Sequence, residues 1–270
     1  MSAGLADRAA ALLGARVRQA EAVAGGMVSD VLRLVLEDGR QAVVKSGPAP
    51  RVEAAMLGAL AEAGVPCPAV LAADDAALVI EAMDDDASFD AGAWRLLGHA
   101  VRRLHDATGA RYGWYDDYAF GAVALDNTPT EDWPTFWAER RLLPGLEAVD
   151  PGLARRVEAL AGRLGERLPA RPAASLLHGD LWVGNVLVGR DGAVALIDPA
   201  CYHGHAEVDL AMLSLFASPG AAFAEGYGPF EPGLAERRPV YQLFPALVHR
   251  RLFGRGYSGL VARLLDEAGA

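Results

Sequence analysis

The first third of the chain alternates hydrophobic and polar positions in a way that predicts a small sheet flanked by helices. The predicted strands cover residues 31–36, 41–45, 70–72 and 77–80. An acidic turn containing glycine separates the first two runs, so these should pair as a hairpin. Hydrophobic residues at helical spacing predict an N-terminal helix over residues 2–23 and another over residues 51–63.

The remainder of the chain is predicted to be mostly helical. Hydrophobic periodicity predicts helices over residues 90–108, from Trp133 behind an Asp132 cap, and from about Glu207. Residues 109–133 form a long loop rich in aromatic side chains. A loop of this length without a helical pattern is typical of a lid or of a wall of a binding site.

The change from strands to helices indicates two lobes that share a cleft. A chain of 270 residues is near the size at which single hydrophobic cores stop growing. We predict a small lobe over residues 1–83 and a large helical lobe over residues 84–270. Residues 80–83 would form the crossing between them.

One loop carries the chemistry that organises the rest. Asp180 and Asn185 lie on it with four residues between them, and two apolar runs, 186–188 and 193–197, then lead to Asp198. The runs predict a hairpin that would fold Asp198 back beside the loop. This order of groups is typical of phosphoryl transfer from ATP, in which Asp180 orients a hydroxyl and Asn185 and Asp198 bind Mg²⁺. The alternative for Asp180 is a loop cap.

The small lobe contains matching candidates for phosphate binding. Gly25 and Gly26 precede the first hairpin strand, and Lys45 ends the second. Glycines let backbone N–H groups approach phosphates, and a lysine on a strand can reach their oxygens. Glu53, in the next helix, is the natural ion-pair partner of Lys45. Taken singly, the glycines could be an ordinary turn, Lys45 a solvated side chain, and Glu53 a complement to the helix dipole.

Composition excludes several other classes. The net charge of −10 disfavours nucleic-acid partners. Two cysteines are too few for a disulfide framework, and the sequence shows neither a signal segment nor a membrane span, so we expect a cytoplasmic protein without a membrane partner.

Other catalytic and metal-binding motifs are poorly supported. His178, His203 and His205 do not have the spacing of a closed zinc site. Ser175 lacks the turn of a nucleophile elbow. Nothing in the sequence specifies an oligomeric state.

Four longer blocks of the sequence are distinctive: WPTFWAERRL, HGDLWVGN, IDPACYHGHAEVDLAM and YQLFPALVHRRLFGRGY. Together they resemble the fructosamine kinase, or ketosamine 3-kinase, family within the aminoglycoside phosphotransferase and choline kinase superfamily. The spacing of Asp180 and Asn185 is common to many kinases, whereas Trp182 and the turn after Asp198 are more specific. The resemblance implies an α+β, protein-kinase-like bilobal fold with ATP bound between the lobes.

The resemblance also implies an activity and its site. An ATP- and Mg²⁺-dependent kinase would phosphorylate the 3-hydroxyl of a ketosamine, on a small molecule or a glycated protein lysine, and the product would shed its sugar. Asp180 would be the base, and the backbone from Glu81 to Met83 would contact adenine. Trp182 would contact the sugar or amine, because an indole can stack on a sugar and attract an ammonium. Alternatively, Trp182 is a core residue that braces the loop.

Two rival functions remain at this level. A kinase of the same fold could act on an aminoglycoside, choline or another small alcohol. A pseudokinase would bind nucleotide without chemistry, which the presence of Lys45, Asp180, Asn185 and Asp198 together disfavours.

Overall fold

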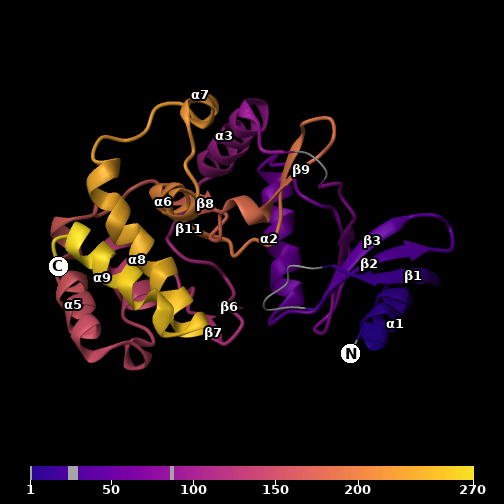
Figure 1. The fold of residues 1–270 in the computed structure, drawn as a ribbon, viewed down its shortest axis with the longest axis horizontal. Coiled ribbons are helices and arrows are strands. Elements are labelled where there is room, and N and C mark those ends of the chain that lie inside the picture. Colours follow the sequence, from indigo (N-terminus) through magenta and orange to yellow (C-terminus); the bar gives the residue numbers. More distant parts are fainter. Residues whose placement is uncertain (1, 24–29, 86–87) are drawn as a thin grey trace.

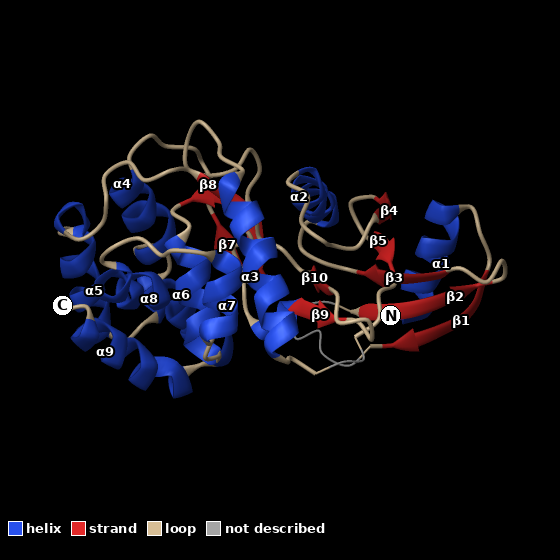
Figure 2. Cartoon of the chain, turned by 90° about the horizontal axis from the view of Figure 1, so that it is seen from above, coloured by secondary structure: helices blue, strands red, loops and turns tan. Residues whose placement is uncertain are grey.

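The computed structural model describes residues 2–23, 30–85 and 88–270 and divides into a strand-rich part and a helical part (Figures 1 and 2). Within the described residues, an antiparallel sheet has the order β1-β2-β3-β5-β4. Its strands are β1 (Val17–Ala22), β2 (Val31–Leu36), β3 (Gln41–Lys45), β4 (Val70–Ala73) and β5 (Leu78–Glu81). The predicted hairpin is confirmed, because Val31 of β2 pairs with Lys45 of β3.

The predicted N-terminal helix over residues 2–23 is too long. Helix α1 (Ser2–Leu13) ends before Gly14, whose φ of 58° lies in the left-handed region. Residues 17–22 form β1 instead, and Val17 pairs with Leu36 of β2. Most of β1 is exposed, so side-chain burial contributes little to its choice of structure. Residues 17–22 form a strand because their backbone hydrogen-bonds to the edge of β2, and the hydrophobic periodicity of the sequence cannot predict that pairing.

Helix α2 (Pro50–Glu62) lies between the sheet and the helical part (Figure 2). Proline at its first turn is pre-shaped for a helix start. Its Leu57 packs with Leu78 and Ile80 of the sheet, whereas Met56 and Leu60 belong to the core of the helical part. Because α2 is buried on both sides, the position of Glu53 on it is set by both parts of the molecule.

The helical part surrounds one large core. Its α-helices are α3 (Ala91–Asp106), α4 (Trp133–Trp137), α5 (Pro151–Ala161), α6 (Glu207–Phe216), α7 (Ala221–Tyr227), α8 (Leu234–Phe253) and α9 (Ser258–Glu267). Asp132 caps α4, as predicted, and Asp90 caps α3. None of the helices in the described part of the chain is long and apolar enough to cross a bilayer.

Short antiparallel strand pairs complete the helical part and carry its functional loops. They are β6 (Tyr118–Phe120) with β7 (Val123–Leu125), β8 (Ser175–Leu177) with β11 (Tyr202–Gly204), and β9 (Val186–Val188) with β10 (Val194–Leu196). The β9–β10 pair is the hairpin predicted before Asp198. The architecture is α+β with two lobes, as expected, while the boundary between residues 1–83 and 84–270 stays a prediction.

Candidate active site

A buried carboxylate holds the loop that follows β8. Both oxygens of Asp209, on α6, accept backbone N–H groups, from His178 at 2.7 Å and from Gly179 at 3.0 Å. Gly179 has φ of 79°, and a Cβ there would lie 2.0 Å from the carbonyl oxygen of Ala200. Only glycine fits this turn. The loop is therefore fixed by α6 before any ligand arrives.

Asp180 and Asn185 lie side by side on this loop. Asn185 closes a 3₁₀ turn (Val183–Asn185). Its Nδ2 donates to Oδ2 of Asp180 at 3.0 Å and to the backbone carbonyl oxygen of Asp180 at 2.8 Å. This donation leaves the amide oxygen of Asn185 available as a metal ligand. The carbonyl of Asn185 also accepts the N–H of Ile197 at 3.0 Å, so the hairpin returns Asp198 to the loop.

Lys45 joins the two lobes electrostatically. Its Nζ lies 2.6 Å from Oε1 of Glu53 and 2.6 Å from Oδ1 of Asp198. Burial lowers the pKa of Lys45, but the two carboxylates outweigh it, so the pKa lies above its usual value. The lysine therefore stays charged and ready for anionic oxygens. The ion pair with Glu53, which the sequence left open, is present.

Tyr118 contacts Glu53, and the sequence did not single out this interaction. Its hydroxyl, on β6, donates to Oε2 of Glu53 at 3.2 Å. Burial and the Glu53 carboxylate both raise the pKa of Tyr118, so the phenol remains a donor. The aromatic richness of residues 109–133 was the available signal, but the partner lies 65 positions away.

One cavity of about 500 Å³ collects most of the predicted site residues. Lining residues from the predicted set are Lys45, Glu53, Asp180, Trp182, Asn185 and Asp198. Trp182 is 38% exposed, which is unlike a core tryptophan. Its indole lies across Gly184, where a Cβ would be 2.2 Å from the ring. The loop thus presents the indole face beside Asp180.

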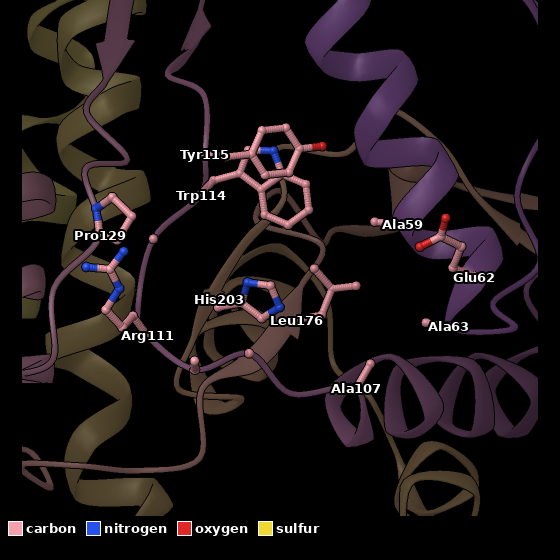
Figure 3. A pocket seen from close by; sticks show the side chains of 13 residues that line it. Ala59, Glu62, Ala63, Ala107, Arg111, Trp114, Tyr115, Pro129, Leu176 and His203 are labelled. Atoms are coloured by element: carbon pink, nitrogen blue, oxygen red, sulfur yellow. The ribbon is translucent and has the colours of Figure 1, made fainter.

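The aromatic loop contributes to this cavity and to another. Tyr118 and Phe120 line the cavity that contains Asp180. Trp114 and Tyr115 stack on each other and line a separate cavity of about 490 Å³, together with His203 (Figure 3). The loop is therefore a wall, and its β6 segment (Tyr118–Phe120) faces the predicted reaction centre.

Other predicted nucleotide contacts are not gathered there. Gly25 and Gly26 lie outside the described residues. Glu81 is the last residue of β5 and Met83 lies two residues beyond it; neither is among the described residues that line the Asp180 cavity. The N–H of Glu81 donates to the carbonyl oxygen of Ala69 at 2.8 Å, so this donor is already used. Their contact with adenine stays a prediction.

The oxygen donors present fit a magnesium ion. Asn185 offers its amide oxygen, as the hydrogen bonds above require. Asp198 pairs with Lys45 through Oδ1, and its side chain is 49% exposed, so the carboxylate is accessible to a ligand. Carboxylate and amide oxygens are hard ligands of the kind Mg²⁺ prefers. Asp198 has φ of 54°, a left-handed backbone that aspartate tolerates better than most residues.

The environment of Asp180 favours its protonated form. Burial above all, with a smaller contribution from the Asp198 and Asp209 carboxylates, raises the pKa of Asp180 to about 7, although the Asn185 hydrogen bond lowers it. The folded protein therefore holds this proton up to about neutral pH, whereas the unfolded chain releases it near 3.8. The stability that this proton contributes is complete below 3.8 and is lost as the pH rises through about 7.

Because the ionised form of Asp180 destabilises the folded protein, we predict that Asp180→Asn stabilises the protein by an amount that depends on pH. Asparagine keeps the shape of the side chain but carries no charge at any pH. The difference in Tm between the variant and the wild type should increase from pH 5 to pH 8, as followed by thermal unfolding. Asp150→Asn is the matched control, because Asp150 is exposed and makes no cap hydrogen bond. A difference that does not vary with pH would contradict the raised pKa.

Comparison with known proteins places the chain in a family. The family model described as Fructosamine kinase matches residues 4–269. A probable ketoamine kinase of Thermus thermophilus is 37% identical over 255 residues, which cover 90% of this chain and 92% of that protein. A probable ketoamine kinase of Synechocystis is 38% identical over 189 residues, covering 64% of this chain but only 61% of that protein.

Solved structures share the whole fold. A structure from Thermobifida fusca that bears the name fructosamine-3-kinase has a TM-score of 0.88 at 34% identity and covers 98% of both chains. An amicoumacin kinase solved with AMP-PNP and Ca²⁺ has a TM-score of 0.66 at 18% identity, over 97% of this chain and 91% of that one. The second likeness shows the protein-kinase-like fold alone. The family model and the first structure together show that the chain belongs to the fructosamine kinase family.

Proposed function

We propose that the protein transfers a phosphoryl group from ATP to the 3-hydroxyl of a ketosamine. The observation that carries the proposal is the grouping of Lys45, Asp180, Asn185 and Asp198 with Trp182 on one cavity. Membership of the fructosamine kinase family supports a ketosamine as the acceptor. A relative from rice is named a protein-ribulosamine 3-kinase, and the amicoumacin kinase of the same fold was solved with an ATP analogue.

Each residue has a role that follows from its position. Lys45 contacts oxygens of the ATP phosphates. Its ammonium group is held by Glu53, and Glu53 is itself held by the hydroxyl of Tyr118. Asp180 accepts a hydrogen bond from the 3-hydroxyl and takes its proton as the oxygen bonds to the γ-phosphorus. The bond from that phosphorus to ADP breaks in the same transfer. A pKa near 7 suits a group that must take up a proton and release it at neutral pH.

Asn185 and Asp198 would hold magnesium, which neutralises charge on the transferring phosphate. Trp182 offers its indole face to the sugar and to the ammonium of the ketosamine, an attraction worth about 0.5–2 kcal/mol. Release of the sugar from the 3-phosphorylated product would make the reaction a deglycation step, and we infer that the protein performs this repair in the cytoplasm.

A substrate panel tests the proposal. ADP release should require Mg²⁺ and a ketosamine such as a ribulosamine or fructosamine, and should be absent with choline or an aminoglycoside. Phosphorus–proton NMR correlation should place the phosphate on the oxygen at C3. Binding of ATP without turnover of any ketosamine would reject the acceptor class. Turnover of choline or an aminoglycoside instead would assign the activity to another branch of the superfamily.

A further inference from the structure

The cavity that contains Asp180 extends far beyond the reacting groups. Its other wall comes from α6, α8 and the 3₁₀ turn Arg255–Tyr257. The lining residues on this wall are Val208, Met212, Phe216, Phe244, Pro245, Val248, His249, Leu252, Phe253 and Tyr257, which we call the apolar chamber. Among these described residues there is no aspartate, glutamate, lysine or arginine.

Aromatic rings gather around His249 in the apolar chamber. The ring centroids of Phe216, Phe253 and Tyr257 lie 5.1, 5.3 and 5.1 Å from that of His249. Phe216 and Phe253 are 43% and 40% exposed. Large apolar side chains that remain exposed beside a reaction centre are more informative than buried ones, because their exposure to water is costly until a ligand covers them.

His249 offers one ring nitrogen to a ligand. Its Nδ1 lies 2.8 Å from the carbonyl oxygen of Pro245, and a carbonyl oxygen can only accept, so Nδ1 carries the proton. Only Nε2 of the ring is then left to face a ligand. One imidazole nitrogen and a phenol, with no lysine or arginine among the chamber residues, replace little of the water around a carboxylate, and its desolvation is costly.

The position of the apolar chamber assigns it to the acceptor. Lys45 and Asp198 mark the side of the phosphates, and Asp180 and Trp182 mark the place of the attacking hydroxyl and its sugar. The remaining part of the ketosamine is the group bonded to the amine nitrogen, and this group would occupy the apolar chamber. We propose that this group is bulky and apolar, so that the preferred acceptors are ketosamines of aralkyl or branched alkyl amines. This inference rests on the proposed function and narrows its substrate.

The same reasoning disfavours adducts of free amino acids. Such an adduct carries a carboxylate next to the amine, and the chamber wall has no arginine or lysine to receive it. A glycated protein lysine has an apolar stem but continues into a hydrated peptide backbone. An aromatic amine fills the chamber without burying an unpaired polar group.

The test compares ribulosamines of 2-phenylethylamine, glycine and a blocked lysine. The wild-type enzyme should turn over the phenylethyl adduct with a kcat/KM about tenfold or more above that of either of the others, the scale that apolar pockets achieve. Phe216→Ser and Phe253→Ser should each bring this ratio towards one. Phe230→Ser is the matched control, because Phe230 is equally exposed at 40% and does not line the cavity. It should leave the ratio unchanged.

The outcomes separate the inference from the function on which it rests. Equal kcat/KM values, or a preference for the glycine or lysine adduct, would overturn the inference while leaving ketosamine phosphorylation in place. A preference for the phenylethyl adduct that persists in both serine variants would also overturn it. Failure to turn over any ketosamine would reject the proposed function, and the inference with it.

Discussion

Replacing Asp180 with asparagine is expected to lower kcat by about 10²–10⁴-fold, the usual contribution of a positioned general base. Asparagine keeps an oxygen that can accept the hydrogen bond from Asn185, so the loop geometry should persist. The amide cannot take a proton from the attacking hydroxyl. The rate of ADP release at saturating ribulosamine and ATP measures the loss, and titration with AMP-PNP and Mg²⁺ should show nearly unchanged nucleotide affinity.

The control for this result is Asp150→Asn, which changes the net charge of the protein by the same amount at an exposed site. It should retain the wild-type kcat. An Asp180→Asn enzyme that keeps more than about a tenth of the wild-type kcat would show that Asp180 is not the base, since loss of a positioned general base typically costs about 10²-fold or more. A parallel loss of nucleotide affinity would indicate a disturbed fold of the site.

Replacing Asp198 with asparagine is expected to be comparably damaging, for a different reason. Asparagine tolerates the left-handed backbone at φ of 54°, so the substitution removes charge without straining the turn. Lys45 loses one of its two carboxylate partners, and the proposed magnesium site loses its anionic ligand. We expect kcat to fall by about 10²–10³-fold, the usual cost of removing one group that stabilises transition-state charge.

Magnesium dependence distinguishes this effect from that of Asp180. The magnesium concentration that gives half-maximal ADP release should increase in Asp198→Asn and stay near the wild-type value in Asp180→Asn. Thermal unfolding of both variants establishes that they are folded. If Asp198→Asn has the wild-type kcat and the wild-type magnesium dependence, Asp198 does not bind the metal.

Sequence and structure agree best where the signal is local. Asp180 and Asn185 lie on one short loop, so their spacing alone places them together. The hairpin that returns Asp198 is a local pattern of two apolar runs and a turn, and β9 and β10 pair as expected.

Prediction failed where pairing between segments decides the structure. Residues 17–22 continue a helical spacing of apolar residues, but they form β1 because the edge of β2 offers its hydrogen-bonding groups. Tyr118 was hidden for a similar reason. Nothing in the residues near Tyr118 indicates that its hydroxyl meets Glu53 on α2.

The sequence by itself determined the type of chemistry, because the acid, the amide and the second acid needed for phosphoryl transfer occur in a spacing that a loop and a hairpin can assemble. It also determined the family, through blocks that extend over the helical part. Only the tertiary structure decided how Lys45 is shared by Glu53 and Asp198, since Glu53 comes from a separate element of the small lobe and Asp198 from the other lobe. Only the packing of α6 against α8 revealed the apolar chamber, because helical periodicity gives the same apolar pattern to a core wall and to a binding wall.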